Sequence, residues 1–368
     1  NNINNINNSL NSSNYLYNGN CGNINPNNIN NINTESDEED AANNIEEDLF
    51  IDEENTSLGL SKIQGGINYF NAIIQCFAYI KDISDSMSNL KKSQTMINPE
   101  RYKLSREYRS LLINIFFPEN VFNINRHPFS PDKLVNTLNK LYPKFQQDEY
   151  VDYKDFIDYF IKRLHEELNT KENKMLQNEP TNPSNENDTL VEFIKNFTEN
   201  NYSIISKSLY GLIKSQNHCQ QCQNLFFEYN CFSYLYFNLS NVKDYKMRRM
   251  RREDVFLELT DCLDYYQRPE VLIGDRGIKC PACGVLTEST LIKNIYSTKN
   301  ILIFIFDRKE GDNGYNHDMI DYPDVINLGD YVEYKKKKEK FFLTGVVNLI
   351  GDNFTWGNYV GFCRMGNN

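Results

Sequence analysis

The chain of 368 residues lacks long apolar runs and carries little positive charge for its size. No stretch approaches the roughly 20 consecutive apolar residues that span a bilayer. We find no charged-then-apolar segment typical of a secretory signal. Acidic residues outnumber basic ones by 50 to 39, giving a formal net charge of −11. Because a phosphate backbone repels an acidic surface, we expect neither nucleic-acid nor membrane binding.

Histidine is also scarce, with four residues, at positions 127, 165, 218 and 317. Cysteine occurs nine times, an odd number, and four of the cysteines form two Cys-x-x-Cys pairs. A large chain with 40% hydrophobic residues can build a core without a disulfide scaffold. The pattern therefore favours a reduced compartment and a metal site. We expect an intracellular protein, in the cytoplasm or the nucleus.

The first 56 residues are expected to be a disordered leader. Residues 1 to 33 are rich in asparagine, whose side chain competes with helix and sheet hydrogen bonds. An acidic stretch follows from Glu35 to Glu54. A docking tail for a basic partner is the alternative interpretation of that stretch. The ordered domain is expected over residues 57–367.

The ordered part begins with helices and continues with strands. Apolar residues recur at helical spacing over Tyr102–Phe117 and Asp152–Leu168. β-prone runs follow, including Phe226–Phe232 and Tyr234–Leu239. Helices followed mostly by strands predict the α+β class.

Three polar stretches are expected at the surface. Residues 170–188 are rich in Asn, Glu and Pro and predict a disordered insertion. The basic clusters Lys246–Arg252 and Lys335–Lys338 are expected to be solvated loops or hairpin tips. A binding patch is the alternative for both clusters.

The two Cys-x-x-Cys pairs are the most specific chemical signal in the chain. They are Cys219 with Cys222 and Cys280 with Cys283. Each pair presents two thiolates on a tight turn, and two pairs complete a closed tetrahedral shell. A closed shell predicts structural rather than catalytic Zn²⁺. The alternative is that the four thiols stay reduced and carry no metal.

A Gly-Gly turn at residues 65 and 66 leads directly into a helix. From Phe70 the apolar residues recur at the spacing of one buried helical face. A loop before a helix N-terminus suits a nucleophile, since the helix dipole and free N–H groups lower a thiol pKa. The residue at this point is Asn68, which offers no nucleophile.

Five motifs of the chain occur in an order similar to that of the ubiquitin-specific proteases, the papain-like family of deubiquitinating enzymes. They resemble its cysteine box, its Leu-His-Glu-Glu-Leu helix, its zinc-bearing fingers, its Lys-Arg-Phe strand and its histidine box. In this chain the motifs are Gly59–Gln75, Asp152–Leu168, the two cysteine pairs, Ile301–Arg308, and Phe342–Asn348 with Trp356–Tyr359.

This resemblance implies an α+β, papain-like cysteine protease fold. The implied helical thumb covers about residues 57–200, and the implied β-rich palm and zinc-ribbon fingers cover about 201–367. It also implies ubiquitin or a ubiquitinated protein as partner.

The chain departs from the family at its catalytic positions. The nucleophilic cysteine falls on Asn68 and the general-base histidine on Asn358. The oxyanion-stabilising asparagine falls on Ile63, or on Lys62, and the first histidine of the histidine box on Leu349. A carboxamide is no usable nucleophile, and it cannot accept a proton near neutral pH. We therefore predict an inactive site.

Three functions are weighed. The first is a pseudo-deubiquitinase that binds ubiquitin or acts as a scaffold in a multiprotein complex. The second is an active cysteine-type deubiquitinase that hydrolyses the isopeptide bond at the ubiquitin C-terminus. The third is a zinc-ribbon interaction protein unrelated to the family.

The remaining candidate residues are given structural roles. We expect Asp152 to cap a helix, Asp155 to lie at the surface and His165 to pack within the fold. Trp356 either lines the cleft or packs in the β core. The other cysteines of the domain are interpreted as ordinary buried thiols: Cys76, Cys231, Cys262 and Cys363.

Overall fold

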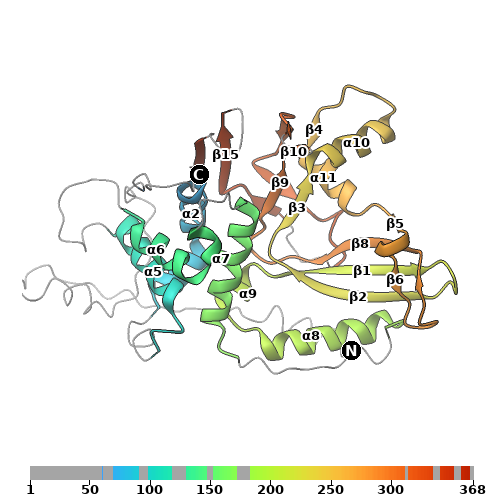
Figure 1. Ribbon diagram of the computed structural model, residues 1–368, viewed down its shortest axis with the longest axis horizontal. Helices are drawn as coiled ribbons and strands as arrows, with labels where there is room; N and C mark the ends of the chain where they lie inside the picture. Colours follow the sequence, from blue (N-terminus) through green and yellow to red (C-terminus); the bar gives the residue numbers. More distant parts are fainter. Residues whose placement is uncertain are drawn as a thin grey trace, which may run out of the picture.

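The computed structural model describes residues 60, 69–90, 98–117, 130–146, 152–171, 183–310, 314–334, 340–351 and 358–364. Helices gather on one side of the molecule and a long-stranded sheet lies on the other (Figure 1). The predicted leader, the predicted insertion between 172 and 182, and the basic run Lys335–Lys338 lie outside these residues. Among the described helices, none is both long and apolar enough to cross a membrane.

The helical side is built around one large apolar core. Its fully buried side chains include Phe70, Ile74, Tyr108, Phe156 and Phe160. The helices that supply this core are α2 (Phe70–Ala78), α3 (Lys81–Ser88), α5 (Lys103–Phe116), α6 (Asp132–Leu141), the 3-10 helix η3 (Pro143–Gln146), α7 (Tyr153–Leu168) and α9 (Ile204–Ser208). The helical spacing read from the sequence thus predicts α5 and α7 to within one residue.

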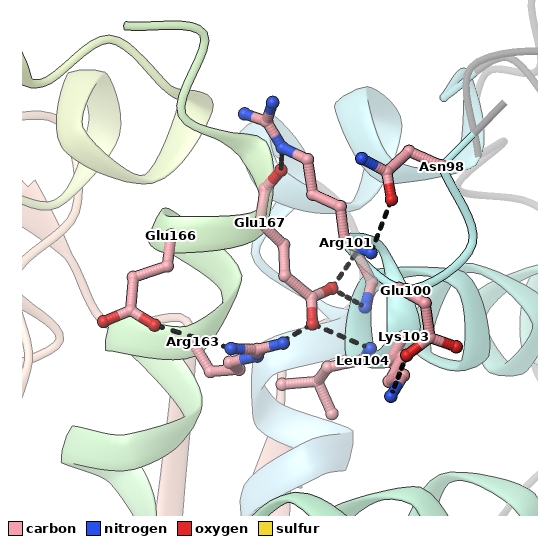
Figure 2. A network of polar contacts seen from close by, with 9 residues as sticks. Asn98, Glu100, Arg101, Lys103, Leu104, Arg163, Glu166 and Glu167 are labelled. Atoms are coloured by element: carbon pink, nitrogen blue, oxygen red, sulfur yellow. Dashed lines mark hydrogen bonds and ion pairs between the residues drawn. The ribbon is translucent and has the colours of Figure 1, made fainter. Parts of the chain in front are cut away.

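A buried carboxylate joins α7 to the start of α5 (Figure 2). Helix α5 begins without a side-chain cap of its own. Glu167 of α7 is 2% exposed and accepts hydrogen bonds from the backbone N–H groups of Leu104 at 3.0 Å and Ser105 at 2.8 Å. The Arg163 guanidinium pairs with the same carboxylate at 2.9 Å. Negative charge at a helix N-terminus is favourable, so Glu167 satisfies free donors and compensates the α5 dipole.

His165 fixes the other side of α7. Its Nδ1 lies 2.7 Å from the Ser203 hydroxyl, and its Nε2 lies 3.0 Å from the Asn201 side-chain oxygen. Asp152 caps α7 by accepting from the Lys154 backbone N–H at 2.8 Å, and Asp155 is exposed. The structural roles predicted for Asp152, Asp155 and His165 agree with these positions.

The long sheet is antiparallel and four-stranded. Its order is β2 (Leu225–Phe232), β1 (Gly211–Cys219), β8 (Ser289–Ser297) and β5 (Glu270–Leu272). Helix α8 (Glu186–Asn200) packs on this sheet through Leu190 and Ile194 (Figure 1).

The position of helix α8 differs from two boundaries that the sequence predicts. It begins at Glu186, inside the stretch 170–188 expected to be disordered, because Asn185 caps its first turn and its apolar face packs on β2. It also lies with the sheet, whereas α9, after residue 200, packs into the helical core. The boundary between the helical side and the sheet is therefore not a single point at residue 200, because α8 packs with the sheet and α9 with the helical core.

The rest of the strand-rich side consists of short paired strands and two helices. Strand β3 (Leu235–Asn238) runs parallel to β9 (Phe304–Asp307), and β4 (Leu257–Glu258) runs parallel to β12 (Ile320–Asp321). The antiparallel pairs are β6 (Ile278–Lys279) with β7 (Leu286–Thr287), β10 (Lys309–Glu310) with β11 (Gly314–Tyr315), β13 (Val325–Asn327) with β14 (Lys340–Phe342), and β15 (Gly345–Ile350) with β16 (Asn358–Cys363). The α+β class is confirmed.

The two helices of this side correct one prediction. Helix α10 (Leu239–Met250) contains most of the basic cluster Lys246–Arg252, which is therefore not a loop or hairpin tip. Ion pairs from Lys246 to Asp261 at 2.7 Å and from Arg249 to Asp264 at 2.5 Å hold α10 on α11 (Leu259–Tyr266). The short 3-10 helix η4 spans Gly274–Arg276.

We expect Glu167→Gln to lower the free energy of unfolding by about 2–3 kcal/mol. The amide removes the closer of the two counter-charges of the Arg163 guanidinium, leaving Glu166 at 3.7 Å, and turns a donor toward the N–H groups of α5. Urea unfolding followed by circular dichroism measures the change. Glu166→Gln is the matched control, because this neighbouring carboxylate is largely exposed and should contribute less than about 1 kcal/mol. Equal effects of the two substitutions would contradict the capping role.

His165 should make stability fall with acidification. Burial lowers its pKa below the ordinary value of a histidine, partly opposed by the Asn201 hydrogen bond and the Glu166 charge. A lowered folded-state pKa means that the unfolded chain binds the proton more tightly. Stability is therefore fully present above about pH 6.5 and is lost as the pH falls toward the folded-state pKa. We expect the stability advantage of the wild type over His165→Gln to shrink between pH 7.5 and 5.5, whereas a constant difference would exclude this titration.

Candidate functional site

The residues that directly follow the two positions expected to carry a nucleophile and a base lie in contact. Asn68 lies outside the described residues, but Tyr69 directly follows it and forms the N-cap position of α2. Asn358 is the exposed first residue of β16, and Tyr359 follows it. The rings of Tyr69 and Tyr359 pack edge to face, with centroids 5.8 Å apart. The helix N-terminus after position 68 therefore adjoins the start of β16.

Tyr69 and Tyr359 belong to a cluster of three tyrosines. The Tyr153 ring, at the start of α7, lies 6.4 Å from the rings of both Tyr69 and Tyr359. The Tyr153 hydroxyl donates to the Phe306 carbonyl at 2.7 Å, which joins α7 to β9. Burial, aided by the Asp152 charge, raises the pKa of Tyr69 and Tyr153 far above neutral pH. These phenols stay protonated and act by packing rather than by exchanging protons.

Two glycines let the β15–β16 hairpin lie directly on α2. A Cβ atom at Gly361 would lie 2.9 Å from the Ala72 carbonyl oxygen, and one at Gly345 would lie 3.2 Å from the Cys76 Sγ. At Gly361 a side chain would meet backbone, so the close approach requires glycine there, whereas at Gly345 the Cys76 side chain would have to shift by a few tenths of an ångström. A cavity of about 1480 Å³ borders this contact, between α2, β9 and the hairpin.

The three histidines within the described residues have other neighbours or lie in a strand. His165 is bound to Ser203 and Asn201, His218 lies in β1, and His317 packs on Tyr315 with ring centroids 4.7 Å apart. Leu349 pairs with Tyr359 across the hairpin and is apolar. The positions Ile63, Lys62, His127 and Trp356 lie outside the described residues.

The four cysteines of the two Cys-x-x-Cys pairs meet at the far end of the long sheet. Their Sγ atoms all lie within 4.8 Å of one another, with Cys222 to Cys280 at 3.6 Å and Cys219 to Cys283 at 4.0 Å. Four sulfurs each 2.3 Å from one ion in a tetrahedron would be about 3.8 Å apart. The cluster therefore has the donor set and spacing to hold a metal ion.

The turns around the cysteines have the backbone that such a site needs. Gln223 and Gly284, each directly after the second cysteine of a pair, have positive φ values of 59° and 71°. The Gly284 N–H donates to the Cys280 carbonyl at 2.8 Å, closing that turn. Burial opposes ionisation of Cys280, but the backbone N–H groups of Cys283 and Ala282, with neighbouring thiols, lower its pKa to about 7. A thiol with this pKa is readily available as a thiolate ligand.

The sequence analysis missed two features of the site. It gave no role to the aromatic contact of Tyr69 with Tyr359, although each directly follows a catalytic position in its box. It also interpreted Cys76 and Cys363 as separate buried thiols. The structure places their Sγ atoms 3.6 Å apart, and both side chains are only half-buried. Their separation in sequence gives no signal that they meet.

Comparison with known proteins identifies relatives throughout the ordered part. Residues 62–368 match the family described as ubiquitin carboxyl-terminal hydrolase. Ubiquitin carboxyl-terminal hydrolase Usp2 of Drosophila melanogaster is 22% identical over 85% of this chain and 32% of its own length. Probable ubiquitin carboxyl-terminal hydrolase 4 of Schizosaccharomyces pombe is 23% identical over 68% of this chain and 42% of its own. The chain thus spans less than half the length of these two relatives.

A solved structure supports the same fold. A chain of the SAGA DUB module bound to monoubiquitin aligns with a TM-score of 0.59 and 18% identity, covering 85% of this chain and 62% of that one. The papain-like fold of the ubiquitin-specific protease type, predicted from the sequence motifs, is therefore confirmed. The family match extends over most of the chain, including β16 and the four clustered cysteines. The chain belongs to the ubiquitin carboxyl-terminal hydrolase family.

Proposed function

We propose that this chain is a non-catalytic member of its family that binds ubiquitin or a ubiquitinated protein. The observation that carries the proposal is the pair of carboxamides, Asn68 and Asn358, at the positions of nucleophile and base. Asn358 is exposed at the start of β16, next to the Tyr69–Tyr359 contact that adjoins the N-terminus of α2. In this proposal the elements around the catalytic position remain, while amides replace the two reacting side chains.

The chemistry of these side chains supports binding rather than hydrolysis. Cysteine-protease catalysis needs a thiolate, a base within hydrogen-bond reach and donors aimed at the developing oxyanion. An amide side chain donates and accepts hydrogen bonds but takes up no proton near neutral pH. Because triad members act as a unit, losing them costs roughly 10⁴-fold or more in rate. An amide can still hydrogen-bond to the backbone of an extended peptide tail.

We further propose that Zn²⁺ occupies the cluster of Cys219, Cys222, Cys280 and Cys283 and has a structural role. All four ligands would come from the protein, which leaves no open coordination position for substrate or water. The ion would tie the turn after β1 to the turn after β6, at the end of the long sheet. Such a link would keep the sheet as a rigid surface for a globular partner.

The proposal about partners also covers assembly into a multiprotein complex. The SAGA DUB module is bound to monoubiquitin in its solved structure, and that similarity in fold supports ubiquitin as the ligand to test first. A scaffold role in a multiprotein complex is the outcome that remains if ubiquitin does not bind.

Ubiquitin binding without cleavage is the expected result. We expect labelled ubiquitin to bind the full chain with a micromolar dissociation constant in a fluorescence titration. A ubiquitin C-terminal electrophilic probe should form no adduct, and di-ubiquitin should remain intact. An adduct or cleavage would establish an active deubiquitinase, and absence of binding would leave the scaffold role.

A double substitution tests whether the cleft around these positions is intact. In the double variant Asn68→Cys with Asn358→His, the probe should react with the new thiol. The single variant Asn358→His is the matched control and should stay unreactive. A double variant that binds ubiquitin but does not react would show that more than two side chains separate this site from a working one.

Metal analysis tests the zinc proposal. We expect about one zinc per chain by plasma mass spectrometry, since four thiolates complete the shell. Cys280→Ser should lose most of the metal and lower the melting temperature. Cys262→Ser, at a fully buried cysteine outside the cluster, should retain the metal. A metal-free wild-type chain that melts at the same temperature with and without added zinc would contradict the proposal.

A further inference from the structure

A pair of cysteines outside the metal cluster lies where the hairpin meets α2. Cys76 is in the second turn of α2, and Cys363 is the last residue of β16. Their Sγ atoms are 3.6 Å apart and share a hydrogen bond. Both are free thiols, and both are half-buried rather than enclosed. Small oxidants can therefore reach the pair.

Gly345 creates the space in which the two thiols meet. In the hairpin register Gly345 lies directly opposite Cys363. A Cβ atom at position 345 would lie 3.2 Å from the Cys76 Sγ and 3.3 Å from its Cβ. The Cys76 side chain thus takes the place that a side chain of residue 345 would fill. It also lies 3.8 Å from the Val346 carbonyl oxygen, to which its thiol can donate.

We propose that Cys76 and Cys363 are a redox modification site and form a reversible disulfide between α2 and β16. A disulfide has an S–S length of about 2.05 Å, so the sulfurs must approach by about 1.5 Å. Rotation about the Cα–Cβ bonds would have to supply this approach while the backbones of α2 and β16 stay packed. The inference does not depend on the chain's binding ubiquitin or lacking catalysis.

The oxidant is a low-molecular-weight disulfide such as oxidised glutathione. The Cys363 thiolate attacks one sulfur of that disulfide, which forms a mixed disulfide and releases one glutathione thiolate. The Cys76 thiol then loses its proton and attacks the Cys363 sulfur, releasing the second glutathione thiolate. Two protein thiols are oxidised, one glutathione disulfide is reduced, and the two protons end on the released thiols. The contact with the Cys76 sulfur at 3.6 Å lowers the pKa of Cys363, which favours Cys363 as the first nucleophile.

The cross-link would join α2 to β16, the two elements that meet at the candidate site. Tyr69 contacts Tyr359 near the start of α2, and Cys76 contacts Cys363 farther along the same helix and the same strand. A bond at the second contact would hold the whole length of β16 on α2. It would also close a loop that includes most of the domain, which limits the unfolded chain and raises thermal stability.

Peptide mapping of the full, zinc-loaded chain tests the proposal. Trypsin releases residues 63–81 and 341–364, and each peptide contains a single cysteine, Cys76 or Cys363. After equilibration with oxidised glutathione, we expect these two peptides to be recovered as a disulfide-linked pair that added dithiothreitol separates. The melting temperature should rise by several degrees on oxidation and return on reduction.

Three variants provide the controls. Cys363→Ser should abolish the linked pair and the rise in melting temperature. Gly345→Ala should lower its yield, since the added methyl group enters the space of the Cys76 thiol. Cys262→Ser, at a buried lone cysteine, should leave both readouts unchanged. Recovery of the two peptides unlinked, or linked to other cysteines as often as to each other, would overturn the proposal.

Discussion

The close packing of α2 against the β15–β16 hairpin is the contact on which the site depends. It rests on two glycines that remove side chains from the hairpin and on the ring contact of Tyr69 with Tyr359. A helix N-terminus and a strand that are distant in sequence are held at one point by this contact. Any larger residue at Gly361 would meet the backbone of α2, so the hairpin and the helix constrain each other directly.

The helices around α2 keep that contact in place without taking part in chemistry. Glu167 and His165 lie near the end of α7. Glu167 binds the start of α5, and His165 binds the segment before α9. Tyr153, at the other end of α7, reaches β9 through the Phe306 carbonyl. One helix thus connects three parts of the fold. The contacts of His165 and Glu167 in the Leu-His-Glu-Glu-Leu motif are structural, so these two residues need no catalytic explanation.

The cysteine cluster lies at the end of the long sheet, whereas position 358 lies in the hairpin that packs on α2, and the two have different chemical character. The cluster keeps four sulfur donors within 4.8 Å and would form a closed shell. At position 358 the side chain is an exposed amide. In the proposed function, the fold keeps a binding surface while amides stand at the two positions where a nucleophile and a base are expected. That combination is the physical basis of the proposed non-catalytic role.

The sequence alone determined the helices with strong apolar periodicity, such as α5 and α7, because that period depends only on residues a turn apart. It also identified the four cysteines that cluster in the fold, since each Cys-x-x-Cys pair is a local turn, and it has carboxamides at positions 68 and 358. Tertiary structure decided the rest. Helix α8 is placed by its packing on β2, α10 by ion pairs to α11, and Glu167 acts on a helix more than sixty residues away in sequence. The meeting of Cys76 with Cys363 depends on Gly345 in a third segment, and no local pattern encodes a contact among three distant segments.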